Sequence, residues 1–573
     1  MKKLAVVTAF GGINSAGRSS GHQAFKRLVL EHLNQSEQLN TLNSLAQLMG
    51  LPQKSSLDTA WQNEIVNGTL IRAWDNIAWD ANAIPFHQPF TDENGSQCWR
   101  LEHKRLAVQS AGQLPKGFDP ASQYKSLHHP RGLQMAIYGI SDALGQLGES
   151  WDKIKNALNP DQVSVYAGSA MSQLDSLGHG GMLQAPLLGK RGSAKQCALG
   201  LSQMSADFIN AYVLGSVGNT GSMAGACASF LYNLKLAVSD IQTGRARVAF
   251  VGSSEAPLLP EVIDGYNSMT ALANEQHLRH LDGLSDDQHP NYRRASRPFA
   301  NNCGFTIAES AQFIMLTDDA LALELGLTIY AGVGEVFVNA DGFKKSISNP
   351  GIGNYLTLGK AVAEAERWLG VEAVQNGSYV HAHGSSTPTN RTTESEIFSK
   401  IAGAFNINRW DITAVKSYLG HSIGSASGDQ IITTLGSWAH AVIPGITSID
   451  SVAEDVHQQH LNFLLKHKEF SAQEKPLAFI NAKGFGGNNA SAFLISPEKT
   501  KELLKDKYSA QQWQNYQHKN ETVLATSKEW DTQTSLGNSQ TTYIFGEAVL
   551  QPEDLTLTKE SIYLKGWRKA INL

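Results

Sequence analysis

A cysteine at the end of a run of small residues is the side chain in this sequence best equipped to act as a nucleophile. Residues 218–229 read GNTGSMAGACAS, and apolar residues then recur at helical spacing from Phe230 to Ile241. This pattern places Cys227 at or near a helix start, where free backbone N–H groups and the helix dipole lower the pKa of a thiol. An isolated cysteine in such a context is more often a small buried core residue. The chemistry therefore depends on partners elsewhere in the chain.

Two histidines supply candidate partners. His383 lies in YVHAHGSSTP (379–388), and His421 lies in AVKSYLGHSIG (414–424), which also carries Lys416. Each histidine follows a predicted strand at the point where it opens into a loop, which is where sites form in parallel α/β sheets. Either one alone could be a structural histidine. Together with Cys227, they indicate a cysteine–histidine active site.

The elements that must position these residues alternate along the chain. Predicted strands cover residues 4–10, 163–167, 248–252, 311–316, 379–381 and 477–481, and predicted helices cover 132–147, 229–242 and 358–369. This alternation predicts an α/β protein with a parallel sheet covered on both faces. Residues 30–126 are polar and lack strong periodicity, so they look like an insertion. From residue 498 the chain turns charged and polar, which predicts an added tail packed on the core, with disorder over 527–540 as the alternative.

Composition narrows the class of protein. A chain of 573 residues exceeds what one hydrophobic core usually serves, and its net charge of -5 argues against sequence-independent nucleic-acid binding. The four cysteines form no CxxC pair, which fits neither a disulfide framework nor a zinc site. No apolar stretch approaches the roughly 20 residues of a membrane-spanning helix, and the first apolar run reads as a buried strand rather than a signal peptide. We therefore expect a cytoplasmic protein without membrane insertion.

The order of the motifs resembles that of the β-ketoacyl-acyl-carrier-protein synthases. The motifs are GACAS around Cys227, SRPF at 296–299, GF at 304–305 with Glu309, HGSSTP from His383, Lys416 with GH at 420–421, and Asn481 with GFGGNN at 484–489. The resemblance covers most of residues 124–497 and the first strand.

This resemblance implies a thiolase-like fold, in which two βαβαβαββ halves form a five-layer α-β-α-β-α sandwich, normally as a homodimer. On this basis, residues 1–30 and 121–325 form the N-terminal half and 326–497 the C-terminal half. Residues 31–120 are expected to be an insertion within the N-terminal half, and 498–573 a C-terminal extension.

The resemblance also implies roles for the reactive side chains. Cys227 would carry the acyl group as a thioester, which keeps that group reactive toward a carbanion. His383 and His421 would polarise the malonyl thioester carbonyl and stabilise the enolate left by decarboxylation. Lys416 would orient the histidines, with Glu309 as its ion-pair partner. No metal or redox cofactor is expected.

Three further residues would handle the substrate. The backbone N–H groups of Cys227 and Phe485 would form the oxyanion hole, and the Phe485 side chain would gate the acyl pocket. Ser385 and Thr387 would hydrogen-bond the pantetheine arm. The expected partners are an acyl carrier protein bearing malonyl-phosphopantetheine and a donor that is either acyl-CoA or an acyl carrier protein.

Departures from the common pattern bear on the subgroup. Ala300 stands where an acidic residue is usual, Cys303 precedes Gly304 in place of an aspartate, and Asn390-Arg391 replaces Gly-Asp. With the insertion and the tail, these changes resemble the larger bacterial ketosynthases that start fatty acid synthesis from acetyl-CoA and malonyl carrier protein. A chain-elongating ketosynthase of fatty acid or polyketide synthesis is the close alternative.

Two other functions compete. Residues 420–424 (GHSIG) fit the G-x-S-x-G elbow of an α/β-hydrolase, which would make Ser422 the nucleophile. However, small residues follow Ser422 where a regular helix should begin. A non-catalytic chain-length factor would typically lack the cysteine, so Cys227 argues against that function.

Overall fold

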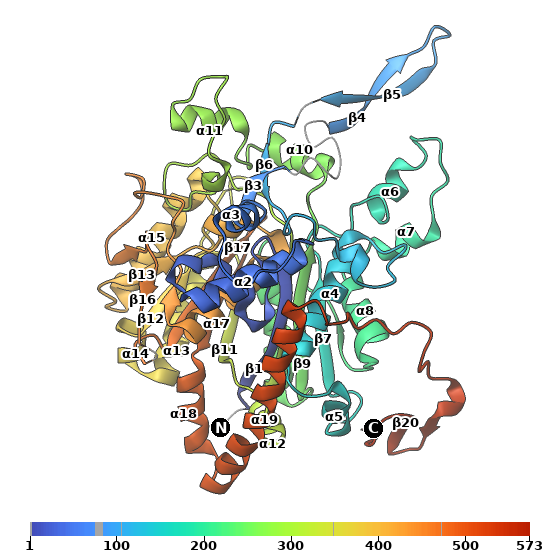
Figure 1. The fold of residues 1–573 in the computed structure, drawn as a ribbon, viewed down its shortest axis with the longest axis vertical. Helices are drawn as coiled ribbons and strands as arrows, with labels where there is room; N and C mark the ends of the chain where they lie inside the picture. Colours follow the sequence, from blue (N-terminus) through green and yellow to red (C-terminus); the bar gives the residue numbers. More distant parts are fainter. Residues whose placement is uncertain (1–2, 75–83, 105, 348, 472) are drawn as a thin grey trace.

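The computed structural model describes residues 3–74, 84–104, 106–347, 349–471 and 473–573, and a mixed twelve-stranded sheet organises them (Figure 1). The N-terminal half contributes β1 (Ala5–Asn14), β2 (Gly17–Arg18), β7 (Val163–Gly168), β8 (Thr220–Gly221), β9 (Val248–Glu255) and β10 (Ser310–Asp318). The C-terminal half contributes β11 (Ala331–Ala340), β12 (Ser378–His381), β13 (Trp410–Thr413), β15 (Leu461–Phe463), β17 (Leu477–Gly484) and β18 (Asn488–Ile495).

The two halves repeat one order of elements. The helices that alternate with these strands are α4 (Arg131–Gln146), α8 (Met204–Ile209) and α9 (Ser229–Thr243) in the first half, and α13 (Gly353–Leu369), α15 (Pro388–Ala404) and α17 (Ala426–His440) in the second. The first half runs β1-α4-β7-α8-β8-α9-β9-β10 and the second β11-α13-β12-α15-β13-α17-β17-β18. Both halves therefore follow the βαβαβαββ pattern that the resemblance implied.

The sheet is mixed, so the prediction of a parallel sheet is correct only for its outer strands. β7, β8 and β9 pair in parallel in one half, as do β12, β13, β15 and β17 in the other. The central pairs β9–β10, β10–β1, β1–β11, β11–β18 and β18–β17 are antiparallel. The alternation of strands and helices could not reveal this. In the repeat, the last two strands of each half follow each other without a helix: β17 leads directly to β18, and the helices between β9 and β10 have no counterpart in the second half.

Five layers follow from the helix contacts. α9 contacts β9 and β11, and α17 contacts β10 and β17, so these helices lie between the two halves of the sheet. α4 covers β1 and β10 from outside, and α13 covers β11 and β18. Along β10, Ala311, Phe313 and Met315 face the outer core, while Ile314 and Leu316 face the central one. Burial of each such large side chain contributes about 1.5–3 kcal/mol to the stability of the fold. Because alternate side chains of β10 enter two different cores, the strand is apolar at successive positions.

The segment expected to be an insertion, residues 31–120, forms ordered elements. It contains α2 (Gln35–Leu48), α3 (Thr59–Asn67), β3 (Ile71–Ala73), β4 (Ile84–Thr91), β5 (Gln97–Lys104) and β6 (Ser110–Gly112). A capping box between Asn34 and Glu37 starts α2. The antiparallel pair β4–β5 extends away from the rest of the molecule (Figure 1).

The remaining elements connect or flank this framework. They are α1 (Gln23–Leu28), α5 (Trp151–Asn156), α6 (His179–Gln184), α7 (Ala194–Leu199), α10 (Pro260–Ser268), α11 (Glu275–Asp282), α12 (Asp319–Leu325), α14 (Val371–Gln375), α16 (Lys416–Leu419), β14 (Val442–Ile443), β16 (Lys468–Glu469), α18 (Pro497–Lys507), α19 (Ala510–Ser535), β19 (Leu555–Leu557), β20 (Ser561–Leu564) and β21 (Ile571–Asn572). None of the helices formed by the described residues has both the length and the apolar character needed to cross a bilayer.

The tail packs against the core through α19. This helix contacts α4, α12 and α2, and it buries Trp513, Tyr516 and Val523. Ser509 and Gln512 form a capping box at its start. The helix continues to Ser535, so the alternative of disorder over 527–540 is wrong for most of that range. The sequence signal for this helix is the helical spacing of Trp513, Tyr516 and Val523. The polar composition of the surrounding residues makes that signal easy to overlook.

A buried ion network joins the tail to the first strands. Arg18 is 1% exposed, and its guanidinium lies 2.5 Å from Asp531 of α19 and 3.7 Å from Asp142 of α4. Asp142 also accepts hydrogen bonds from the backbone N–H groups of Gly12 and Ser20. This carboxylate therefore holds together β1, the turn after β2, and α4.

Replacing Asp142 should destabilise the protein more than replacing Asp531. Asp142→Ala leaves a buried guanidinium with one partner fewer and two N–H groups without an acceptor, which we expect to cost about 3–5 kcal/mol. Asp531→Ala should cost less, because the Asp531 side chain is 22% exposed and Arg18 keeps Asp142. Urea unfolding followed by circular dichroism measures both. Equal losses would show that Asp142 is not the centre of the network.

Candidate active site

One cavity of about 180 Å³ brings Cys227, His383 and His421 together. Cys227 lies just before α9, His383 just after β12, and His421 between α16 and α17. The two imidazole rings have centroids 5.2 Å apart and stand at 84° to each other. Three distant stretches of backbone therefore present one sulfur and two imidazoles to a common space.

A strained turn places the thiol. Ala226 adopts a left-handed backbone conformation, with φ at 48°. Such a conformation is unusual for a residue with a side chain and persists only where the surroundings fix it. Here Ser229 fixes it, because its hydroxyl accepts from Gly225 N–H at 2.9 Å and donates to Ala226 O at 2.7 Å. The first turn of α9 thus holds Cys227 immediately before the helix.

The expectation that this position lowers the thiol pKa is wrong. Burial raises the pKa of Cys227 to about 11, because it removes the thiolate from water. The charge of Lys416 and the backbone N–H groups of Phe485 and Cys227 act in the opposite direction, but burial outweighs them. The resting thiol is therefore protonated at neutral pH. The same two N–H groups are those that the resemblance assigns to the oxyanion hole.

Both histidines are neutral. Burial, reinforced by the charge of Lys416, holds the pKa values of His383 and His421 well below their usual value. Nδ1 of His421 accepts a hydrogen bond from Ile423 N–H at 3.2 Å, so the proton of the neutral ring sits on Nε2. The Phe305 ring packs edge-on against His421 at 5.1 Å. His421 is thus set up as a hydrogen-bond donor through Nε2.

The predicted ion pair between Lys416 and Glu309 is wrong. Lys416 is 2% exposed and donates to the backbone carbonyl of His383 at 2.5 Å. Burial lowers its pKa to about 8. Glu309 instead accepts from Arg131 with both oxygens, at 2.5 and 3.1 Å. The reason is positional, since Glu309 directly precedes β10 and faces the start of α4.

A residue that the sequence reasoning missed, Glu394 of α15, holds the His383 loop. Its fully buried carboxylate accepts from the backbone N–H groups of His383 and Gly384 at 2.7 and 2.8 Å, and from the side chains of Asn390 and Asn481 at 2.9 and 2.8 Å. An acidic residue on the helix that follows HGSSTP was the available signal. The contact itself depends on how α15 packs on β17, which periodicity does not reveal.

The predicted substrate-binding residues line the same cavity. Ser385 and Thr387 lie in its wall, with their hydroxyl oxygens 3.1 Å apart. Phe485 is 45% exposed at the cavity mouth, and it also lines a wide surface depression together with Thr387. Phe485 thus combines an exposed side chain with a place in the cavity wall, and its gating role stays a prediction.

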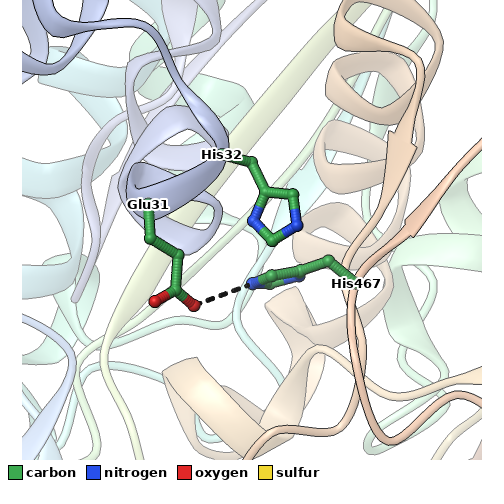
Figure 2. A group of neighbouring side chains, drawn as sticks. All are labelled: Glu31, His32 and His467. Carbon is green, nitrogen blue, oxygen red and sulfur yellow. Dashed lines mark ion pairs between the residues drawn. The ribbon is translucent and has the colours of Figure 1, made fainter.

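A possible metal-ligand cluster lies apart from this cavity. Glu31, His32 and His467 have ligand atoms within 4.8 Å of one another, and Figure 2 shows the Glu31 carboxylate directed at the His467 ring. Gly445 N–H donates to Nδ1 of His467, which puts the proton on Nε2, 3.7 Å from Glu31. A metal ion at Nε2 would have to displace that proton. We therefore assign the cluster as a polar contact between the exposed side chain of Glu31 and the buried side chain of His467 rather than as a metal site.

The hydrolase alternative built on Ser422 is wrong. Ser422 is 1% exposed, and its hydroxyl donates to Asp429 at 2.5 Å. Asp429 is in turn surrounded by Asn14, Ser310 and Gln312. Ser422 therefore belongs to a sealed polar network inside the molecule and does not line the cavity.

The pH dependence of alkylation tests the state of the thiol. With a pKa of about 11, Cys227 should react with iodoacetamide at a rate that keeps rising well above neutral pH. Peptide mass spectrometry after timed alkylation measures the rate at Cys227, and the exposed Cys197 serves as an internal control for reagent quality. A plateau at Cys227 near the ordinary thiol value of about 8.5 would contradict the burial effect.

Comparison with known proteins identifies the family of the chain. Residues 50–322 match the N-terminal domain of β-ketoacyl synthases, and residues 330–450 match the C-terminal domain. The β-ketoacyl-[acyl-carrier-protein] synthase FabY of Pseudomonas aeruginosa is 42% identical over all of this chain and 98% of its own. The 3-oxoacyl-[acyl-carrier-protein] synthase 2 of Vibrio cholerae is 26% identical over 68% of this chain and 90% of its own.

Solved structures agree on the fold. The crystal structure described as the noncanonical ketosynthase FabY from P. aeruginosa superposes with a TM-score of 0.96 at 41% identity, covering 100% of this chain and 98% of that one. A polyketide ketosynthase complex with its acyl-carrier protein superposes with a TM-score of 0.59 at 16% identity, covering 87% of this chain and all of that one, which bears on the fold alone. The chain belongs to the β-ketoacyl synthase family.

Proposed function

We propose that this chain condenses a Cys227-bound acyl group with malonyl carrier protein, as a β-ketoacyl-acyl-carrier-protein synthase does. The observation that carries the proposal is the single cavity shared by Cys227, His383 and His421. A thiol nucleophile beside two neutral N–H donors suits a reaction that passes through an acyl-enzyme and then an enolate.

In the first half-reaction, the sulfur of Cys227 attacks the donor thioester and loses its proton. Hydrogen bonding by the backbone N–H groups of Cys227 and Phe485 lowers the pKa of the Cys227 thiol. They are also placed to donate to the carbonyl oxygen as it becomes negative. The C–S bond of the donor breaks, the leaving thiolate takes up the proton that Cys227 lost and departs as the donor thiol, and the acyl group stays on Cys227 as a thioester.

In the second half-reaction, the malonyl C–C bond to the carboxylate breaks and carbon dioxide leaves. The electron pair moves into an enolate whose oxygen accepts hydrogen bonds from His383 and His421. One such donor is commonly worth about 3 kcal/mol in the transition state. The enolate carbon then attacks the Cys227 thioester, the C–S bond breaks, and the Cys227 thiolate takes up a proton from solvent to return to the resting thiol. Lys416 and Glu394 act as positioning residues, because both hold the backbone of His383.

The partners follow from this reaction. Malonyl carrier protein is the proposed extender, in line with the relative of P. aeruginosa that is named a β-ketoacyl-[acyl-carrier-protein] synthase. Ser385 and Thr387 line the route that a pantetheine arm would take. A homodimer, expected from the resemblance, remains part of the proposal.

We further propose that the reaction is the initiating one, with acetyl-CoA as donor. The cavity of about 180 Å³ has room for a short acyl group beside Cys227. The chain also aligns along its full length, tail included, with a ketosynthase described as noncanonical. Elongation of longer acyl chains is the competing proposal.

Variants should separate the two half-reactions. Cys227→Ala removes the nucleophile, so we expect neither acyl-enzyme nor condensation product. His383→Ala and His421→Ala should still form the acyl-enzyme but lose about 10²–10³-fold in condensation rate, because each removes an enolate donor. Intact-mass spectrometry follows acylation, and release of labelled carbon dioxide from malonyl carrier protein follows condensation. Undiminished condensation in either histidine variant would contradict the assigned roles.

Donor preference tests initiation against elongation. We expect incubation with acetyl-CoA alone to add one acetyl group to the intact protein, at Cys227, because a short acyl group fits the cavity. Octanoyl and longer acyl carrier proteins should label far less. Labelling only by the longer donors would remove the initiating assignment while leaving a condensing enzyme.

A further inference from the structure

A lysine that the mechanism above does not use lines the catalytic cavity. Lys483 is near the end of β17, two residues before Phe485, and shares the cavity wall with Cys227 and both catalytic histidines. Its charge is among the influences that lower the pKa of His383, so the ammonium group lies close to that ring. Lys483 is only partly exposed, and burial lowers its own pKa.

This ammonium group has an incomplete set of partners. Nζ donates to Thr393 Oγ1 at 2.9 Å, and the Thr393 hydroxyl donates onward to Thr389 O at 2.8 Å. An ammonium has three N–H donors. Among the residues that the structure describes, Lys483 forms no ion pair.

The nearest carboxylates are already engaged. Glu394 accepts the four hydrogen bonds given above, all from neutral groups. Asp341 accepts from Gly353 N–H and Asn489, and it pairs with Lys344 at 3.5 Å. Both carboxylates raise the pKa of Lys483 but neither bonds to it. A partly buried cation that has no bonded anion and faces a cavity can pair with an anion that a ligand brings.

We propose that Lys483, oriented by Thr393, forms a subsite for the free carboxylate of the malonyl donor. The assignment rests on the proposed condensing function and names the group that distinguishes the extender from a simple acyl donor. The phosphate of a pantetheine arm is the other anion available. It lies at the far end of that arm from the thioester, whereas Lys483 shares the cavity of Cys227.

The chemistry defines what such a subsite contributes. The cation binds the carboxylate before the C–C bond breaks, and the product carbon dioxide carries no charge. The interaction therefore weakens as the transition state is reached. It lowers the KM for the malonyl donor without raising kcat, which is the signature of ground-state binding. Through this ground-state interaction, Lys483 selects the extender substrate and does not stabilise the enolate.

The test compares two thioesters that differ only in the carboxylate. In Lys483→Met, the KM for malonyl carrier protein should rise about tenfold with kcat equal to or above that of the wild type, since a charge-assisted hydrogen bond that weakens before the transition state is lost. Acylation of Cys227 by acetyl loaded on the same carrier should keep its half-saturation within about twofold, because that thioester has the phosphate but no carboxylate. Lys483→Arg should restore most of the malonyl affinity.

Matched controls separate this role from general effects. Lys344→Met removes a positive charge from the same cavity wall. Lys344 already pairs with Asp341 and donates to Ile347 O, so the ratio of the malonyl and acetyl half-saturation values should stay within about twofold of wild type. Thr393→Val keeps the charge of Lys483 but removes the hydroxyl that orients its ammonium group. This variant should raise the malonyl KM by a smaller factor than Lys483→Met does.

The outcomes are distinct. A selective rise in the malonyl KM supports the subsite. An equal effect of Lys483→Met on both carriers would instead assign Lys483 to the pantetheine phosphate or to carrier docking. An unchanged malonyl KM would remove any substrate role. If Lys483→Met does not fold, Thr393→Val decides, since an unchanged malonyl KM there overturns the proposal. A wild-type protein that acylates Cys227 but never condenses would instead overturn the proposed function.

Discussion

The buried carboxylate of Glu394 is the interaction on which the arrangement of the site depends. It joins the end of β12, the loop after it, and β17 through four hydrogen bonds. Two of these fix the backbone of His383 and Gly384, so the carboxylate decides where the His383 ring stands. Burial of an anion is costly unless it is fully hydrogen-bonded, and here every bond comes from a neutral group. The charges of Lys416 and Lys483 act on it from a distance, and its charge opposes the effect of burial on both lysines.

The electrostatic design of the resting site follows from this burial. Low polarity keeps Cys227 protonated and both catalytic histidines neutral. Lys416 carries a positive charge behind the His383 backbone, and Lys483 carries one in the cavity wall. Negative charge is therefore absent from the reactive groups until a substrate develops it as an enolate, an oxyanion or a thiolate. Donors fixed in advance stabilise such charge without reorganising, which is more useful here than a permanently ionised thiol.

The sequence predicted the reactive residues better than their surroundings. Cys227, His383 and His421 were recognisable because each stands at an element boundary next to small residues, a pattern visible locally. The ion pair of Lys416 was misassigned because its partner depends on packing, and Glu309 faces Arg131 of α4 instead. Glu394 and Lys483 were missed for the same reason, since nothing in their local sequence shows that α15 and β17 lie beside the same cavity. The thiol pKa was predicted in the wrong direction because helix position is local, whereas burial is a property of the whole fold.

Duplication explains why such distant segments converge. In the repeated order of elements, α9 of the first half corresponds to α17 of the second, and these two helices contact each other between the sheets. Cys227 lies just before α9, and His421 lies in the short connection that leads into α17. The two residues thus occupy corresponding places in the two repeats, and pairing the central helices brings their starts together. The second half then adds His383 after β12 and Phe485 after β17 from strands that are direct neighbours. Since neighbouring parallel strands end at the same edge of a sheet, the loops that follow them reach the cavity from one side. The active site is therefore a consequence of the packing of two similar halves, in which the first half supplies the cysteine and the second half supplies the two histidines.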